Sequence, residues 1–174
     1  GIYALMLEAP DPKAEAEILL ERGVKVLPLM RGAGGRDIHP SSTHGVLIRI
    51  YPAGSVAQPE KVVSQAPNYS GIQKVIVATR DAGLACDAYS RGLGLSSDPP
   101  QADFDRGVVS SIVRPPQGGI IELVSPIDTS KATGAEIDEF LTSNGEGICC
   151  LVLSADGDVP ERDINLFGTR ILIS

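Results

Sequence analysis

Short apolar runs alternate with polar turns along the whole chain. One order of elements recurs three times: an apolar strand, an acidic or polar turn, a helical stretch, a glycine and a second strand. The three repeats begin at residues 3, 73 and 149. Spacings of this size suit a duplicated supersecondary unit and are too long for a solenoid repeat. The pattern therefore predicts tandem modules that each contain several strands and one helix.

Capping residues mark the predicted helices of the first two repeats. Asp11 is suited to cap a helix over 12–22, and Gly23 is suited to end it. Asp81 is suited to cap a second helix in the same way. The positions expected to be buried are Ala14 and Ile18 on the first helix, and Leu84, Ala85, Ala88 and Tyr89 on the second.

Further strands and helices complete the modules. Strands are expected at 24–27 and 45–51 in the first repeat, at 108–113 and 119–124 in the second, and at 168–173 in the third. The third repeat is expected to form a helix over 156–167, as the other two do after their first strands. Another helix over 134–142 would join the second and third repeats and bury Ile137, Phe140 and Leu141.

The sequence therefore predicts an α+β fold of tandem βαβββ modules. The expected segments are a first module at 1–52, a connector at 53–70 with one helical turn at 59–64, a second module at 71–126, a linking helix at 127–146 and a partial third module at 147–174. Because the third module stops after its second strand, we expect either a fragment or a homodimer in which another copy supplies the missing strands.

Composition narrows the class of protein. Hydrophobic residues make up 43% and charged residues 21% of the 174 residues, which is typical of a globular protein. A net charge of −7 argues against nucleic acid as a partner, because a phosphate backbone would be repelled. No apolar run approaches the roughly 20 residues that span a bilayer, so we expect a soluble protein without a membrane partner. An odd number of cysteines, three in all, favours a reducing, cytoplasmic compartment.

Three passages resemble a known family. They read GGRDIHPSSTHGVLIRI at 34–50, GIIELVSP at 119–126 and EFLTSNGEGICCLVL at 139–153. They are similar to the glyoxalase, or vicinal-oxygen-chelate, superfamily, and within it to the branches of methylmalonyl-CoA epimerase and 4-hydroxyphenylpyruvate dioxygenase. The resemblance implies the fold of the glyoxalase, bleomycin-resistance and dihydroxybiphenyl dioxygenase proteins, in which paired modules curl into a cupped mixed sheet around the site.

The resemblance also implies where metal ligands would lie, on the first and last strands of each module. These positions fall on Ala4, Arg49, Lys74, Glu122 and Cys150. Only Glu122 is a usual ligand of a divalent metal, since Arg49 stays protonated and the cation of Lys74 would repel a metal ion. We therefore expect no cofactor and no metal site. A divalent metal would bind only if Glu122 found ligands outside the family positions.

The same positions indicate an anion-binding cup. Arg49, Lys74 and Glu122 together would leave a surplus positive charge, which suits a small anionic ligand. Glu122 and Lys74 are the candidate catalytic residues. The candidate substrate-binding residues are Arg49, His39, His44 and Cys150.

A structural role is the alternative for each candidate. Glu122 and Lys74 would form only an ion pair across the sheet, and His39 would stabilise a turn. Cys149 and Cys150 are adjacent on a strand, so they are expected to face opposite sides as two small buried hydrophobic residues.

Three kinds of function remain open. The first is an enzyme related to the lyases, isomerases and dioxygenases of the glyoxalase superfamily, acting on a small carbonyl or carboxylate compound in the cup between modules. The second is a metal-free protein that binds or sequesters a small molecule and has lost the metal chemistry. The third is a structural subunit that dimerises through exposed sheet edges.

Overall fold

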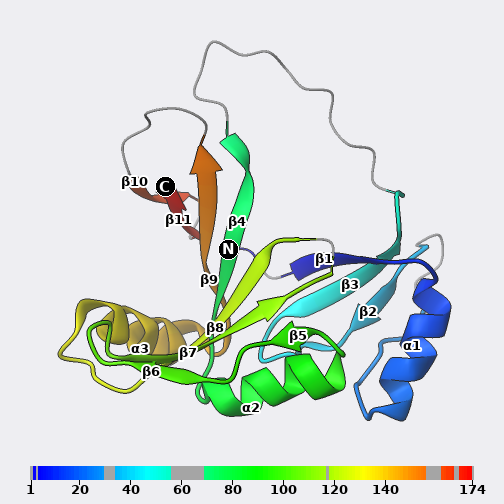
Figure 1. Ribbon diagram of the computed structural model, residues 1–174, viewed down its shortest axis with the longest axis horizontal. Helices are drawn as coiled ribbons and strands as arrows, with labels where there is room; N and C mark the ends of the chain where they lie inside the picture. The colour runs from blue at the N-terminus through cyan, green and yellow to red at the C-terminus, as the bar shows by residue number, and fades with distance from the viewer. Residues whose placement is uncertain are drawn as a thin grey trace.

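The computed structural model describes residues 2, 4–29, 34–55, 69–116, 118–155, 162–166 and 169–173. The fold is α+β, as predicted, with α-helices packed against two mixed β-sheets of three and eight strands (Figure 1). No helix in the described part of the chain is long and apolar enough to cross a membrane. The helical turn predicted at 59–64 lies outside the described residues.

The first module forms the three-stranded sheet. Its elements are β1 (Ala4–Ala9), α1 (Pro12–Glu21), β2 (Arg36–Ile38), a 3-10 turn (Pro40–Ser42) and β3 (Leu47–Pro52). β1 pairs in parallel with β3, and β3 pairs antiparallel with β2. The strand predicted at 24–27 contributes only a single bridge, between Val26 and Ile38.

The second module begins the eight-stranded sheet. Its elements are β4 (Tyr69–Ala78), α2 (Ala82–Asp87) with a π-helical continuation (Ala88–Gly92), β5 (Ser96–Ser97), β6 (Gln101–Asp103), β7 (Val108–Arg114) and β8 (Ile120–Pro126). β4 pairs in parallel with β8, and β8 pairs antiparallel with β7. The order of strands therefore repeats that of the first module. Helix α3 (Ala132–Asn144) follows and is longer than predicted.

The third repeat departs from the prediction. Its strands are β9 (Gly147–Ala155), β10 (Arg162–Leu166) and β11 (Thr169–Ile173). The helix predicted over 156–167 is therefore wrong for residues 162–166, which form a hairpin with β11. Polar and apolar residues alternate with a period of two from Asp163 to Leu166, and this period fits a strand better than a helix.

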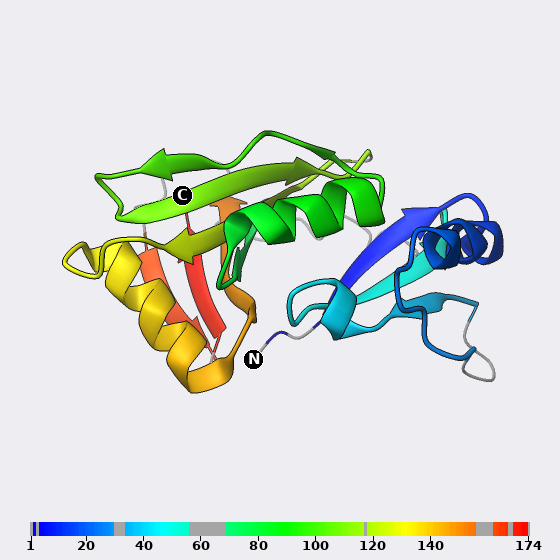
Figure 2. The same ribbon diagram turned by 90° about the horizontal axis from the view of Figure 1, so that it is seen from below.

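The second and third modules share one sheet. The strand order is β10-β11-β9-β4-β8-β7-β5, with β6 also paired to β7, and β4 and β9 are antiparallel neighbours at its centre. The first module lies beside this sheet with α2 at the junction (Figure 2). The cup is thus formed by the second and third modules.

Local chemistry sets the helix ends as predicted. Asp11 Oδ1 accepts hydrogen bonds from the backbone N–H groups of Lys13 (2.9 Å) and Ala14 (3.2 Å). Gly23 follows α1 with a φ of +81°, which glycine adopts without strain. Asp81 caps α2 through the same kind of hydrogen bonds.

The buried faces of the helices differ in part from the prediction. α1 buries Ala16 and Leu19, while Ala14 and Ile18 are exposed. On α2, Leu84 is also exposed. A short helix can have two neighbouring faces that are both apolar enough to be buried. Contact with the sheet then decides which of the two faces is buried.

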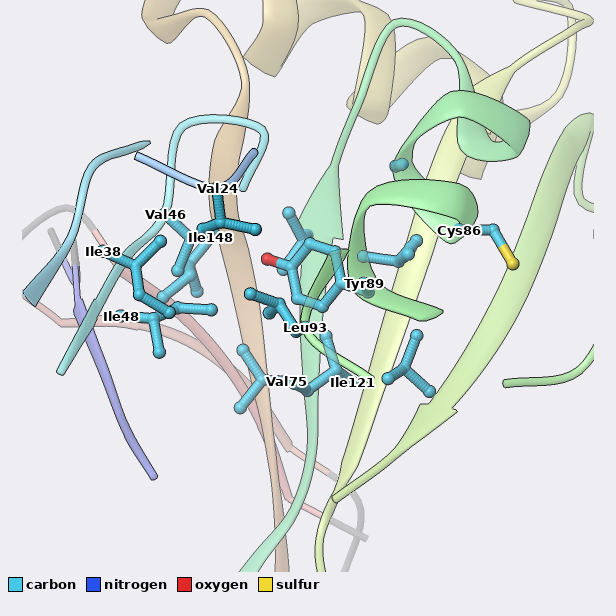
Figure 3. Packing of buried hydrophobic residues seen from close by; sticks show 14 of the residues in the cluster. Val24, Ile38, Val46, Ile48, Val75, Cys86, Tyr89, Leu93, Ile121 and Ile148 are labelled. Carbon is cyan, nitrogen blue, oxygen red and sulfur yellow. The ribbon is translucent and has the colours of Figure 1, made fainter. Parts of the chain in front are cut away.

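One hydrophobic core joins the two sheets. Tyr89, at the end of the α2 segment, is completely buried between Ile48 of the first sheet and Ile121 of the second (Figure 3). Its Oη donates a hydrogen bond to the carbonyl oxygen of Thr43 at 3.1 Å. A second cluster lies under α3 and consists of Ala78, Val108, Val124, Ile137 and Leu141. The first module is therefore packed against the second rather than tethered to it.

Candidate functional site

A pocket of about 580 Å³ lies between α3 and the eight-stranded sheet. Its apolar wall includes Ile76 of β4, Phe140 of α3 and Leu172 of β11. Its polar wall includes two cations, Arg106 and Arg170, and three carboxylates, Glu136, Glu139 and Asp163. This volume is suited to a small organic molecule.

A buried carboxylate, that of Glu122, lies beside the pocket and binds its lining residue Arg106. Glu122 has a side-chain exposure of 2%, and its two oxygens accept hydrogen bonds from different cations. Lys74 Nζ lies 2.8 Å from Oε2, and Arg106 Nη1 lies 2.8 Å from Oε1. Two cations on one carboxylate leave this cluster with one surplus positive charge.

The strand register explains why these residues meet. Lys74 pairs with Ile120, and Ile76 pairs with Glu122, in the parallel ladder between β4 and β8. Side chains alternate between faces, so Lys74, Ile76 and Glu122 share the face that carries the pocket. Arg106 comes from the turn between β6 and β7, where its backbone N–H donates to Asp103 Oδ1 at 3.0 Å.

The environment of Glu122 keeps it ionised. Burial by itself would raise the pKa of this carboxyl, but the hydrogen bonds from Lys74 and Arg106 and their charges outweigh burial and hold the pKa below its usual value. Both oxygens are also occupied by these donors. Glu122 is consequently a weak proton acceptor that positions two cations.

The structure divides the cluster predicted from the sequence. Arg49 does not join Lys74 and Glu122, because it makes a two-point ion pair with Asp37 on the neighbouring strand of the first sheet. Arg106 takes the place expected for Arg49. No pattern in the sequence pointed to Arg106, because its turn lies outside the strands on which the family positions fall.

The two histidines lie away from the pocket. His39 Nδ1 accepts a hydrogen bond from the backbone N–H of Ser41 at 3.0 Å, so it stabilises the turn before β3. His44 Nδ1 lies 3.1 Å from Glu146, whose Oε1 also accepts from the backbone N–H of Arg80 at 2.8 Å. The structure therefore gives both histidines structural contacts and does not bring them to the predicted substrate-binding cluster.

Cys150, a candidate substrate-binding residue, lines the pocket, and Cys149 lines it as well. The expectation that these neighbours face opposite sides is wrong, because a register shift opposite Ile76 and Val77 interrupts the alternation of β9. Burial raises the pKa of the Cys149 thiol to about 12 and also raises that of Cys150. Neither thiol is therefore activated as a nucleophile.

Arg170 is a further pocket residue that the sequence did not indicate. It lies on β11 opposite Cys150, and its guanidinium lies 2.7 Å from Asp163 and 2.5 Å from Glu136. Asp163 belongs to β10, which was expected to be helical. The sequence analysis therefore did not predict the cross-strand ion pair between Asp163 and Arg170. Two carboxylates neutralise Arg170, whereas Arg106 shares a single carboxylate with Lys74.

Comparisons with known proteins support the fold. No family model and no curated protein matches the chain. Among solved structures, 4-hydroxymandelate synthase from Streptomyces coelicolor, in a mutant form, superposes with a TM-score of 0.64 and 15% identity over 89% of this chain and 49% of that one. Methylmalonyl-CoA epimerase from Mycobacterium tuberculosis superposes with a TM-score of 0.50 and 19% identity over 65% of this chain and 91% of that one.

The chain has the vicinal-oxygen-chelate fold. It spans about half the length of the 4-hydroxymandelate synthase chain. The two named structures match the two branches that the sequence resembled. At these identities the likeness establishes the fold, and the chemistry has to be argued from the residues of this chain.

The residues of this vicinal-oxygen-chelate cup do not fit the divalent metal that the family implies. Among the described residues, no three His, Cys, Asp or Glu side chains lie close enough together to hold a metal ion. Glu122, the one family position with a usual ligand, already accepts from Lys74 and Arg106. A metal ion at Glu122 would have to displace both cations.

Proposed function

We propose that this protein binds a small carboxylate-bearing molecule in the pocket beneath α3, without metal chemistry. The observation that carries the proposal is the position of Arg106. It lines the pocket while its Nη1 is held by the buried carboxylate of Glu122. Because a guanidinium has five N–H donors, Arg106 can hold Glu122 and still donate to a ligand carboxylate.

The apolar wall of the pocket suits the carbon chain of such a ligand. Ile76, Phe140 and Leu172 offer an apolar surface for a short carbon chain. Arg170 carries its own two carboxylates, so Arg106 is the cation better able to accept an added anion. A ligand with an apolar body and one carboxylate would match this pocket.

The enzymatic alternative, a lyase, isomerase or dioxygenase relative, is less well supported. General base catalysis near neutral pH favours a carboxyl with a raised pKa and a free oxygen. Glu122 has a lowered pKa and two occupied oxygens. Lys74 is held by the same ion pair, so its role as a catalytic amine is also less favoured.

Isothermal titration calorimetry with propionate and butyrate tests the proposal. We expect both to bind, and the uncharged propionamide and butyramide not to bind, because the amides lack the charge that Arg106 recognises. Arg106→Gln should weaken carboxylate binding by about tenfold or more, the loss expected for one charge-assisted contact. Equal binding of amides and carboxylates would contradict the proposal.

Arg114→Gln is the matched control for this experiment. Arg114 also makes a two-point contact with an acid, Asp98, but on the exposed part of the sheet outside the pocket. This variant should bind the carboxylates as the unmodified protein does. If Arg106→Gln and Arg114→Gln behaved alike, Arg106 would not be the recognition residue.

Elemental analysis separates the binding protein from the metal-dependent enzyme. We expect purified protein to hold zinc, iron, manganese and cobalt at far less than one ion per chain. A stoichiometric ion that is lost in Glu122→Ala would overturn the metal-free proposal and favour the enzyme.

A further inference from the structure

Four residues form one row across the sheet at the pocket beneath α3. They are Glu122 of β8, Ile76 of β4, Cys150 of β9 and Arg170 of β11, and each is paired with the next. Neighbouring strands lie about 4.8 Å apart, so the backbones at the two ends of this row are about 14 Å apart. The row therefore has a charged residue at each end and two uncharged residues between them.

The β8 end of the row is positive. Glu122 accepts hydrogen bonds from Lys74 and Arg106, so two cations share one carboxylate. Arg106 is the one of these three residues that lines the pocket. One surplus positive charge is thus presented to the pocket where the proposed function places the ligand carboxylate.

The β11 end of the row is negative. Arg170 lies 2.5 Å from a carboxylate oxygen of Glu136 on α3 and 2.7 Å from one of Asp163 on β10. Two carboxylates on one cation leave a surplus negative charge. Glu139, three residues after Glu136 on the same face of α3, also lines the pocket and is exposed. Within the described ranges, Glu139 forms no ion pair.

The direction of α3 gives the same separation of charge. The backbone N–H of Gly134 donates to the carbonyl oxygen of Arg106 at 3.0 Å, so α3 begins beside the positive end. Glu139 follows about 7.5 Å further along the helix axis, at 1.5 Å per residue. Sheet and helix therefore both set the unpaired carboxylate of Glu139 apart from Arg106.

We infer that the ligand of this pocket is an ω-amino carboxylate, with its carboxylate on Arg106 and its ammonium group on Glu139. The inference rests on the proposed function, which supplies the carboxylate contact. An ammonium group has three N–H donors, so it can bind Glu139 and a second acceptor together. Ile76 and Phe140 of the apolar wall suit the alkyl chain between the two charges. A ligand without a cation would leave Glu139 unpaired.

Isothermal titration calorimetry with hexanoate and 6-aminohexanoate tests the inference. The two differ only by the amino group, and we expect 6-aminohexanoate to bind about fivefold more tightly, the gain from one accessible ion pair. Acetate and glycine test the separation of the charges. Glycine should bind no more tightly than acetate, because an ammonium group next to the carboxylate does not reach Glu139. An equal gain in both pairs of ligands would overturn the inference.

Glu139→Gln identifies the residue that recognises the ammonium group. This variant should bind hexanoate within about twofold of the unmodified protein, which also shows that it is folded, and should lose the gain for 6-aminohexanoate. Asp138→Asn is the matched control, since Asp138 is the preceding residue of α3, is exposed and lies outside the pocket. It should keep the gain. A gain that persists in Glu139→Gln, or that is lost equally in both variants, would overturn the inference.

The hexanoate titration separates this inference from the proposed function. Hexanoate binding that depends on Arg106 but gains nothing from the amino group would overturn the inference and leave the proposed function standing. Failure of hexanoate and 6-aminohexanoate to bind would overturn both.

Discussion

Lys74 Nζ lies 2.8 Å from Glu122 Oε2 although 48 residues separate the two in the sequence. Their strands are parallel neighbours, and Arg106 completes the arrangement from a turn. The buried carboxylate therefore joins three segments of the second module. Its removal should affect stability as well as any ligand bound by Arg106.

Glu122→Gln should destabilise the fold. The neutral amide would leave Lys74 and Arg106 without their shared anion, and since both cations are partly exposed we expect a loss of about 2 kcal/mol in the free energy of unfolding. Urea denaturation at neutral pH measures this loss in the free energy of unfolding. The control is Asp98→Asn, which breaks an exposed ion pair with Arg114 and should cost less than about 1 kcal/mol. Equal losses in the two variants would show that the burial of Glu122 does not increase the contribution of its ion pairs to stability.

Stability should also fall in acid because of Glu122. Its pKa is lowered in the folded protein, so the stabilisation is complete above the usual carboxyl value of 4.5 and is lost as the pH falls through the folded value. The free energy of unfolding should decrease below about pH 4.5. Asp98 and Asp163 also have lowered pKa values, so the comparison must be with Glu122→Gln. The free energy of unfolding should depend less steeply on pH in Glu122→Gln than in the unmodified protein. Identical slopes in the two proteins would contradict the assignment of this pH dependence to Glu122.

The thiols of the pocket should be unreactive in the native protein. Cys149 has a pKa raised to about 12 by burial, so its thiolate is rare at pH 8. Cys86 and Cys150 are buried and free. Reaction with Ellman's reagent should be slow in the folded protein and should reach all three cysteines only in denaturant. A fast stoichiometric reaction of Cys149 or Cys150 in the native state would instead indicate an activated thiol.

Gly45→Ala should weaken the contact between the first module and the turn that precedes β9. Gly45 has a φ of +82°, and a Cβ there would collide with the backbone of Glu146. We expect a loss of about 3 kcal/mol or more, since strain and a backbone clash add. Gly23→Ala is the matched control, because its φ is +81° with no atom within 4 Å of the added Cβ. It should cost about 1 kcal/mol, and thermal unfolding of the two variants compares them.

Only part of the candidate site could be anticipated from the sequence. Lys74 and Glu122 lie within regular strands, so their shared face follows from the alternation of side chains once the strands are paired. The alternative that they form an ion pair is confirmed. Arg106 could not be anticipated, because a turn residue has no periodic pattern that gives its direction.

Local interactions account for what the sequence alone determined. Asp11, Asp81 and Gly23 act within a few residues of their own positions, so the helix ends followed from chemistry that a short segment contains. The repeated order of strands and helix, and with it the fold class, also followed from local periodicity.

Only the tertiary structure decided which segments meet. Arg49 found Asp37 rather than Glu122, and Cys149 and Cys150 came to line one pocket through a register shift. Strand β10 formed where a helix was predicted, because it could pair with β11. Each outcome depends on hydrogen bonds or packing with another strand, and a strand's free energy comes largely from such neighbours rather than from its own residues.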